Sequence, residues 1–136
     1  MRKSKILLIE DTESISDELK DILGFEGYDV YLASNGQLGI DLAKKIIPDL
    51  ILCDVMMPLK DGYQVFSEVK HVEELVDTPF IFLTAKAQNE NLREGMIMGA
   101  DDYITKPFDM DMLILAIQTR LNKEICLYKL KGLISE

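Results

Sequence analysis

The sequence is poor in cysteine, histidine and proline, and it contains no tryptophan. Its two cysteines, Cys53 and Cys126, lie far apart and form no CxxC pair, which argues against a disulfide framework and suits a reducing cytosol. With a single histidine, His71, the chain has no histidine or cysteine cluster that could hold zinc or copper. We therefore expect any metal site to use oxygen ligands.

Long hydrophobic runs are also missing. The longest apolar stretches, such as residues 6–9 and 80–83, are about as long as a strand, whereas a membrane span needs about 20 residues. The basic start at residues 1–5 is followed by a strand-like segment and not by the apolar core of a signal peptide. We expect a cytoplasmic protein without a membrane segment.

Positive charge is in deficit. The chain has 15 Lys and Arg against 24 Asp and Glu, which gives a formal net charge of -9 at pH 7. A surface of this sign repels nucleic-acid phosphates, and no basic stripe or RNA-binding aromatic motif offsets the repulsion. We expect no direct binding of nucleic acid.

Short apolar runs alternate with longer segments of helical period, a pattern typical of repeated βα units and a parallel sheet. Most of the runs are almost continuously apolar, as in strands covered on both faces. We predict one doubly wound α/β domain with helices on both faces of a five-stranded parallel sheet. Its strands are expected at about 5–10, 28–33, 49–54, 79–84 and 101–105.

Apolar spacing predicts five helices between and after these strands. The second helix should use Leu38, Leu42 and Ile46 as its inward face, and a fourth should run from about 89 to 98. The first helix should end at the breakers Gly24 and Gly27, and the third should begin near Gly62. The inward positions expected in the first, third and fifth helices are Ile15, Leu19, Ile22 and Leu23; Tyr63, Phe66 and Val69; and Met112, Leu113, Ala116, Ile117 and Leu121, with Asp109 as the cap of the fifth helix.

Polar residues follow four of the predicted strands. Glu10 and Asp11 end the first, Asp54 the third, Thr84 the fourth and Lys106 the fifth. Parallel strands deliver their carboxyl ends to one edge of the sheet, and in the strand order 2-1-3-4-5 the first and third strands are neighbours. The three acids would then share one crevice.

Three carboxylates in one crevice repel one another and favour a hard cation such as Mg²⁺ or Mn²⁺. The backbone carbonyl of Met56, in the loop after Asp54, could complete the set of ligands. A metal, a carboxylate nucleophile, a hydroxyl and the ammonium of Lys106 are the groups that phosphoryl transfer requires. The product would be an aspartyl phosphate on Asp54.

These residues resemble the response-regulator receiver family of two-component signalling proteins, which is CheY-like and has a flavodoxin-like fold. The resemblance rests on Glu10-Asp11, Asp54-Val55-Met56-Met57-Pro58 with Asp61-Gly62, Thr84-Ala85, and Ala100-Asp101-Asp102-Tyr103-Ile104-Thr105-Lys106-Pro107-Phe108. The matches occur in family order and span residues 5 to about 122.

The resemblance implies a role for each of these residues. It also implies that the protein is a signalling phosphoacceptor and not an enzyme in the usual sense. Asp54 would accept a phosphoryl group from a histidine kinase or a histidine phosphotransfer protein. Glu10, Asp11, Asp54 and the carbonyl of Met56 would hold the metal, and Lys106, followed by a cis peptide bond, would contact the phosphoryl oxygens. Thr84 and Tyr103 would form the switch, and the surface around Tyr103 would be recognised by an output domain or target protein.

Two other functions fit the same fold. An Asp-nucleophile phosphatase would also use Mg²⁺, Thr and Lys, but it usually needs a second acid at the position of Met56 and a cap domain for which this chain is too short. Turnover of small phosphate monoesters would favour it. A receiver-like interaction module that is never phosphorylated is the other alternative, and it would show no metal-dependent labelling.

Residues 123–136 form a separate C-terminal segment beyond the predicted receiver domain at 1–122. A loose helical period continues through it, which indicates a helical extension or the start of a connector to an output domain. Because such a helix could pair with a second copy, the chain could form a homodimer.

Deleting residues 125–136 tests this pairing. The full chain is expected to show concentration-dependent sedimentation that the shortened chain lacks, because the deletion removes the apolar positions Ile125, Leu127, Tyr128, Leu130 and Ile134. Sedimentation velocity measures the difference. Identical behaviour of the two chains would exclude dimerisation through this segment.

Overall fold

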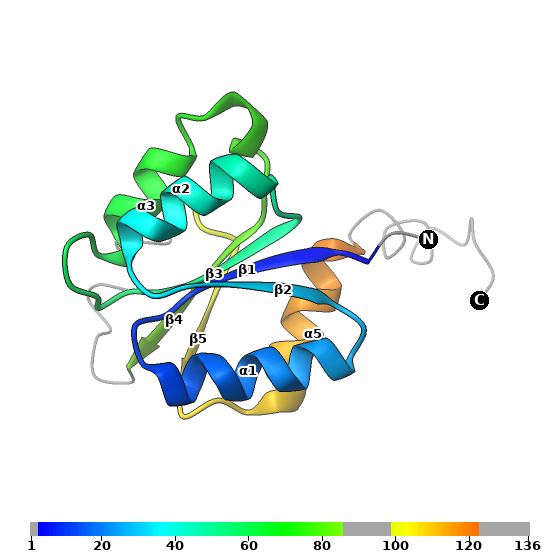
Figure 1. The fold of residues 1–136 in the computed structure, drawn as a ribbon. Helices are drawn as coiled ribbons and strands as arrows, with labels where there is room; N and C mark the ends of the chain where they lie inside the picture. The colour runs from blue at the N-terminus through cyan, green and yellow to red at the C-terminus, as the bar shows by residue number, and fades with distance from the viewer. Residues whose placement is uncertain (1–2, 86–98, 123–136) are drawn as a thin grey trace, which may run out of the picture.

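The computed structural model describes residues 3–85 and 99–122 as alternating strands and helices (Figure 1). The predicted fourth helix and the C-terminal extension lie outside these residues. The elements are β1 Lys5–Ile9, α1 Glu13–Phe25, β2 Asp29–Ala33, α2 Gly36–Ile46, β3 Leu50–Asp54, α3 Gly62–Val69, the short 3-10 helix η1 Glu73–Leu75, β4 Phe80–Ala85, β5 Asp102–Lys106 and α5 Met110–Leu121.

The sheet is parallel and has the predicted order, β2-β1-β3-β4-β5. β1 and β3 are neighbours, with Ile9 opposite Cys53, and β4 and β5 are neighbours, with Thr84 opposite Thr105. The three inner strands are buried on both faces, as their apolar runs predict. All five carboxyl ends therefore lie at one edge of the sheet.

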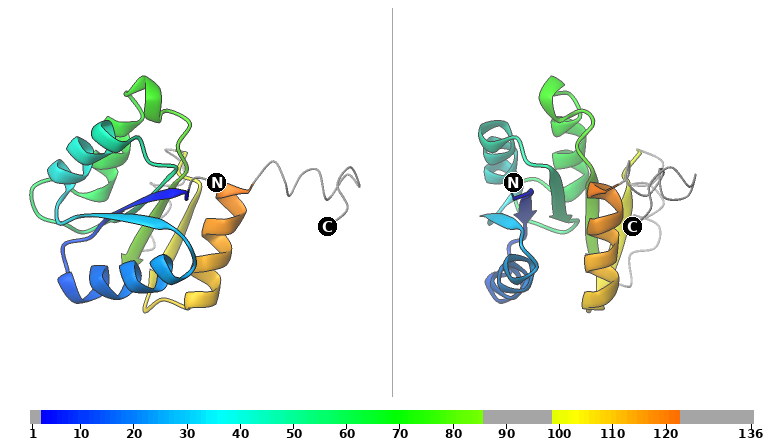
Figure 2. Two further views of the ribbon diagram at one scale, coloured as in Figure 1. Left: turned by 45° about the vertical axis from the view of Figure 1, so that its right-hand side comes forward. Right: turned by 90° about the vertical axis from the view of Figure 1, so that its right-hand side faces the viewer.

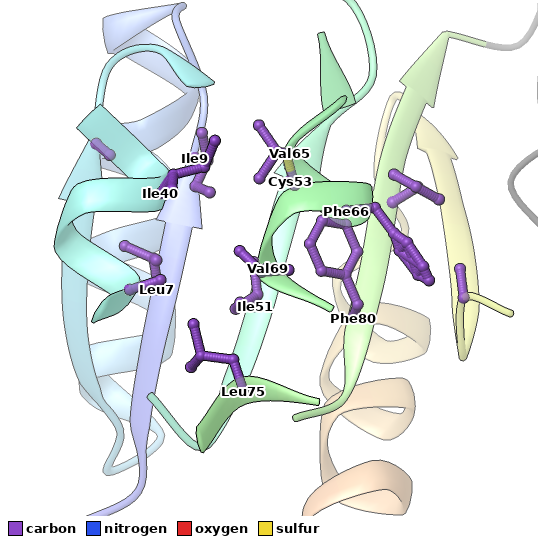
Figure 3. Packing of buried hydrophobic residues seen from close by; sticks show 14 of the residues in the cluster. Leu7, Ile9, Ile40, Ile51, Cys53, Val65, Phe66, Val69, Leu75 and Phe80 are labelled. Atoms are coloured by element: carbon purple, nitrogen blue, oxygen red, sulfur yellow. The ribbon is translucent and has the colours of Figure 1, made fainter. Parts of the chain in front are cut away.

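The two faces of the sheet carry separate cores. Leu7, Ile9, Ile51 and Cys53 point towards α2 and α3 (Figure 3), whereas their neighbours in β1 and β3 point towards α1 and α5. Phe66 of α3 packs edge-on to Phe80 at a centroid distance of 5.0 Å. Figure 2 shows the resulting layers, with α2 and α3 on one side of the sheet and α1 and α5 on the other.

α1 ends at the second of the two glycines that the sequence predicts as breakers. Gly24 lies within the helix, which continues to Phe25, and the left-handed residue that stops it is Gly27, at φ 96°. The N–H of Tyr28 donates to the carbonyl of Leu23, and the N–H of Gly27 donates to that of Gly24, which is a Schellman motif. The helix ends at the second glycine because only that one needs a positive φ.

The predicted inward face of α2 is wrong at Leu38, whereas Leu42 and Ile46 are partly buried and pack against the core. The fully buried positions of this helix are Gly36, Gly39, Ile40 and Ala43, whereas Leu38 is 49% exposed. Gly39 lies directly on Ile9: a Cβ at Gly39 would come within 2.8 Å of Cγ1 of Ile9. The small residues let the helix approach the sheet closely and turn Leu38 and Leu42 to the side.

The caps of α3 and α5 follow from local sequence. Asp61 and Gln64 form a reciprocal capping box at the start of α3, and Asp109 accepts hydrogen bonds from the N–H groups of Asp111 and Met112 at the start of α5. Met112 was expected to face inward, but it is 56% exposed. Leu113, Ala116 and Ile117 fill the core on that side, and α5 ends at Leu121.

Two glycine-to-alanine substitutions should change stability in opposite directions. Gly39→Ala would force Ile9 to move, which lowers the free energy of unfolding by about 1–3 kcal/mol. Gly24→Ala would have open space around its Cβ and should raise stability by up to about 1 kcal/mol through helix propensity. Urea denaturation of the two variants measures the difference, and equal midpoints would contradict the close packing of α2 on β1.

Candidate functional site

The predicted site residues meet at the carboxyl edge of the sheet. Glu10 follows β1 and is 2% exposed, and Asp54 ends β3 and is 4% exposed. Lys106 ends β5 and reaches across to both carboxylates. Glu10, Asp54 and Lys106 are far apart in the sequence but lie close together here, because β1 and β3 are neighbouring inner strands of the sheet.

The ammonium of Lys106 lies between the two buried acids. Its Nζ atom is 2.8 Å from Oε1 of Glu10 and 3.3 Å from Oδ2 of Asp54. Burial alone would lower the pKa of Lys106, but the hydrogen bond to Glu10 and the charges of Asp54 and Glu10 together raise it above its usual value. Lys106 therefore stays positively charged at neutral pH.

Three carboxylates gather beside this ammonium. Glu10, Asp11 and Asp54 each offer an oxygen within 4.8 Å of the others, close enough to ligate one cation. Their all-oxygen chemistry fits Mg²⁺ or Mn²⁺. Asp11 is the exposed member, yet partial burial, followed by a hydrogen bond with Glu10 and the charge of Glu10, raises its pKa. A cation would relieve this repulsion.

Glu10 is more constrained than the sequence indicates. Its Oε2 accepts a hydrogen bond from the backbone N–H of Thr12 at 3.1 Å, while its other oxygen faces Lys106. Both oxygens are therefore occupied by donors. Sequence analysis missed the part that Thr12 plays, because a backbone N–H leaves no signal in residue type.

The loop after Asp54 is held close to the carboxylate. The N–H of Met56 lies 3.4 Å from Oδ1 of Asp54, and the N–H of Gly62 donates to the carbonyl of Val55 at 2.8 Å. A Cβ at Gly62 would lie 2.5 Å from the backbone oxygen of Asp54, so this position requires glycine. Gly62 thus sets the backbone position of Asp54, a role that its motif alone did not reveal.

Thr84 and Tyr103 lie on the same face of the sheet at diagonal positions, because Tyr103 is opposite Phe82 and Thr84 is two residues further along β4. Thr84 is completely buried, and its hydroxyl donates to the carbonyl of Ala85 at 3.3 Å. Tyr103 is 40% exposed. The pair thus has one buried hydroxyl and one ring at the surface.

Cys53 and His71 do not take part in the carboxylate cluster. Cys53 is buried on the face towards α2 and α3, and burial, followed by the charge of Asp54, raises the pKa of its thiol. His71 is exposed after α3, and its ring lies 2.6 Å from the carbonyl of Ser67. The Lys106–Pro107 bond is cis, as the resemblance implies.

Comparison with known proteins identifies the family. A profile described as response regulator receiver domain matches residues 6–118, which is most of the chain. The chain belongs to the response regulator receiver family. This receiver domain is similar to the transcriptional regulatory protein DltR of Streptococcus agalactiae, with 40% identity over 116 residues, covering 85% of this chain and 51% of DltR.

Solved receiver structures have the same fold. The chemotaxis protein CheY4 of Vibrio cholerae is 30% identical, with a TM-score of 0.83, and covers 88% of this chain and 100% of its own. The receiver domain of the sensor histidine kinase PA1611 of Pseudomonas aeruginosa is 30% identical, with a TM-score of 0.82 and coverage of 89% and 99%, and it was solved with a magnesium ion coordinated in the active site cleft. Receiver domains thus occur in regulators and in kinases.

This receiver domain spans about half the length of the curated relatives that it matches. Within residues 3–85 and 99–122, no helix is long and apolar enough to cross a membrane.

Asp11→Asn should separate stability from metal binding. The pKa of Asp11 in the folded state lies above its unfolded value of 3.8. The free energy of unfolding therefore falls as pH rises from the unfolded to the folded pKa. At neutral pH, the ionised carboxylate of Asp11 lowers stability. The variant should therefore melt at a higher temperature than wild type without Mg²⁺ and lose most of the Mg²⁺-dependent rise in Tm. Calorimetry measures both effects, and Asp21→Asn, on the exposed side of α1, is the control. An undiminished Mg²⁺ effect would remove Asp11 from the site.

Proposed function

We propose that the chain accepts a phosphoryl group on Asp54 in a Mg²⁺-dependent (or Mn²⁺-dependent) reaction and changes conformation to control an output. The observation that carries this proposal is the position of Asp54: a buried carboxylate at the end of a central strand, beside two further acids and the charged Lys106. Such a site favours phosphoryl transfer, which depends on positioning and charge neutralisation.

The protein's own groups account for each part of the reaction. An oxygen of Asp54 attacks the phosphorus, the bond from phosphorus to the donor nitrogen breaks, and the nitrogen leaves with its electron pair. Lys106 pairs with the phosphoryl oxygens as Glu10 and Asp54 release it. Glu10, Asp11, Asp54 and the carbonyl of Met56 would hold the metal ion, which neutralises charge on the transferred group.

The chain acts as a signalling phosphoacceptor, with at most self-phosphorylation and autodephosphorylation at Asp54. The phosphatase alternative is weakened because the position two residues after Asp54, where such an enzyme needs an acid, is occupied by the exposed Met56. The interaction-module alternative is weakened because Glu10, Asp11, Asp54 and Lys106 are all present and adjacent.

The phosphoryl donor is a histidine kinase or a histidine phosphotransfer protein in the cytoplasm, where Cys53 keeps a free thiol. The output is a domain or target protein that contacts the surface around Tyr103. Matched relatives are named as transcriptional regulators, and the part that they share with this chain is about half of their length, which favours an output domain joined through residues 123–136. Direct contact with nucleic acid is not part of the proposal, given the net charge of -9.

Asp54→Asn should abolish phosphorylation. The wild type, given Mg²⁺ and acetyl phosphate or phosphoramidate, should gain one phosphoryl group by intact-mass analysis, and the variant should gain none because it lacks the nucleophilic oxygen. Asp21→Asn should label like wild type, and circular dichroism should confirm that all three fold. The same adduct on Asp54→Asn as on wild type would refute the assignment.

Thr84→Ala should remain able to accept a phosphoryl group yet lose the switch. The hydroxyl of Thr84 would donate to the new phosphoryl oxygens, and its movement would let the ring of Tyr103 turn inward. With beryllofluoride and Mg²⁺, the NMR shifts around Tyr103 should be large in wild type and strongly reduced in Thr84→Ala. Lys106→Ala should reduce them too, whereas Thr119→Ala, which removes a hydroxyl from the exposed side of α5, should not. A full response in Thr84→Ala would exclude Thr84 as the coupling residue.

A further inference from the structure

A groove opens along the edge of the sheet next to β2, between α1 and α2. Its volume is about 620 Å³, within the range of ligand-binding clefts. Figure 1 shows β2 as the outer strand, with α1 on one face of the sheet and α2 on the other. We call this feature the edge groove; it is lined by Asp17 of α1, Leu32 of β2, and Leu38, Asp41 and Leu42 of α2, and it reaches the acids Glu10 and Asp11.

Apolar side chains line the edge groove. Leu38 is 49% exposed, and Leu42 and Leu32 are partly buried against the two cores, with the rest of their surface exposed. Leu38 and Leu42 face the groove because Gly39 and Ala43 occupy the side of α2 that packs on the sheet. The exposed apolar surface of these leucines is therefore available to another molecule.

The edge groove is also strongly negative. Carboxylates at Glu10, Asp11, Glu13, Asp17 and Asp41 line it, against one ammonium at Lys45. An anionic ligand or nucleic acid would be repelled. A second copy of this chain, with its net charge of -9, is also a poor partner.

We propose that the edge groove binds an extended segment of a protein partner in which Lys or Arg alternates with Leu or Ile. Alternate residues of an extended chain point to opposite sides. The aliphatic side chains would cover Leu38, Leu42 and Leu32, and the basic side chains on the opposite side would reach Asp17 of α1. This surface is separate from the one around Tyr103, so the chain would have a second docking site.

The proposal is tested with an acetylated five-residue peptide in which leucine alternates with arginine. It is titrated into the ¹⁵N-labelled full chain without Mg²⁺ or phosphoryl donor, so the result does not depend on chemistry at Asp54. Amide shifts should concentrate at β2, the first half of α1 and α2. A serine–arginine peptide should bind at least about tenfold more weakly, because it lacks the leucines, and a leucine–glutamate peptide should not bind.

Variants of the groove provide matched controls. Leu38→Asp and Asp17→Lys should each weaken binding of the leucine–arginine peptide by about tenfold or more. Leu115→Asp, at a similarly exposed leucine of α5, and Glu26→Lys, at the far end of α1, should bind like wild type. Asp54→Asn should also bind normally, which separates this proposal from the proposed phosphorylation.

Several results would overturn the proposal. These are shifts outside the edge groove, equal affinity for the serine–arginine peptide, or equal loss in Leu38→Asp and Leu115→Asp. Self-association of the wild type that Leu38→Asp abolishes in sedimentation would identify a second copy as the occupant instead.

Discussion

The contact on which the rest of this structure depends is the ammonium of Lys106 between Glu10 and Asp54. Two nearly buried carboxylates at neighbouring strand ends would repel one another, and Lys106 crosses from the edge strand β5 to neutralise them. A buried ion pair of this kind contributes little net stability, because desolvation offsets most of the attraction. In the proposed reaction, the pair holds a charged group where new negative charge would appear.

Close packing maintains the geometry of that site. Gly62 allows the loop after β3 to cross the backbone of Asp54, and Gly36 allows α2 to approach the same loop at Lys60, where a Cβ would lie 2.5 Å from the carbonyl oxygen. The two glycines therefore allow strand and loop to be packed from two sides, in addition to the contact of the Met56 N–H with the carboxylate of Asp54. Tyr103 on β5, in contrast, is 40% exposed, so its ring is not enclosed by packing of this kind.

The edge groove is a consequence of the same packing. When glycine and alanine bring α2 close to β1, Leu38 and Leu42 are displaced towards β2 and lie beside the acids of α1. The proposed phosphoacceptor site and the edge groove thus share Glu10 and Asp11 at their boundary. Two functions of one module would meet at this pair of residues, so a ligand at one place could alter the affinity at the other.

The sequence by itself determined the parallel βα units, the chemistry of the carboxyl edge and the cap Asp109, because periodicity, parallel topology and local hydrogen bonding act over short stretches. The strand order was a condition of that prediction, and the tertiary structure confirmed it. The sequence could not determine which of two overlapping stripes on α2 is buried, since that choice depends on how closely Gly39 approaches Ile9. Nor could it locate the N–H of Thr12 on Glu10, or show that Met112 faces solvent. Those features depend on contacts between segments far apart in the chain or on backbone groups, and only the tertiary structure decided them.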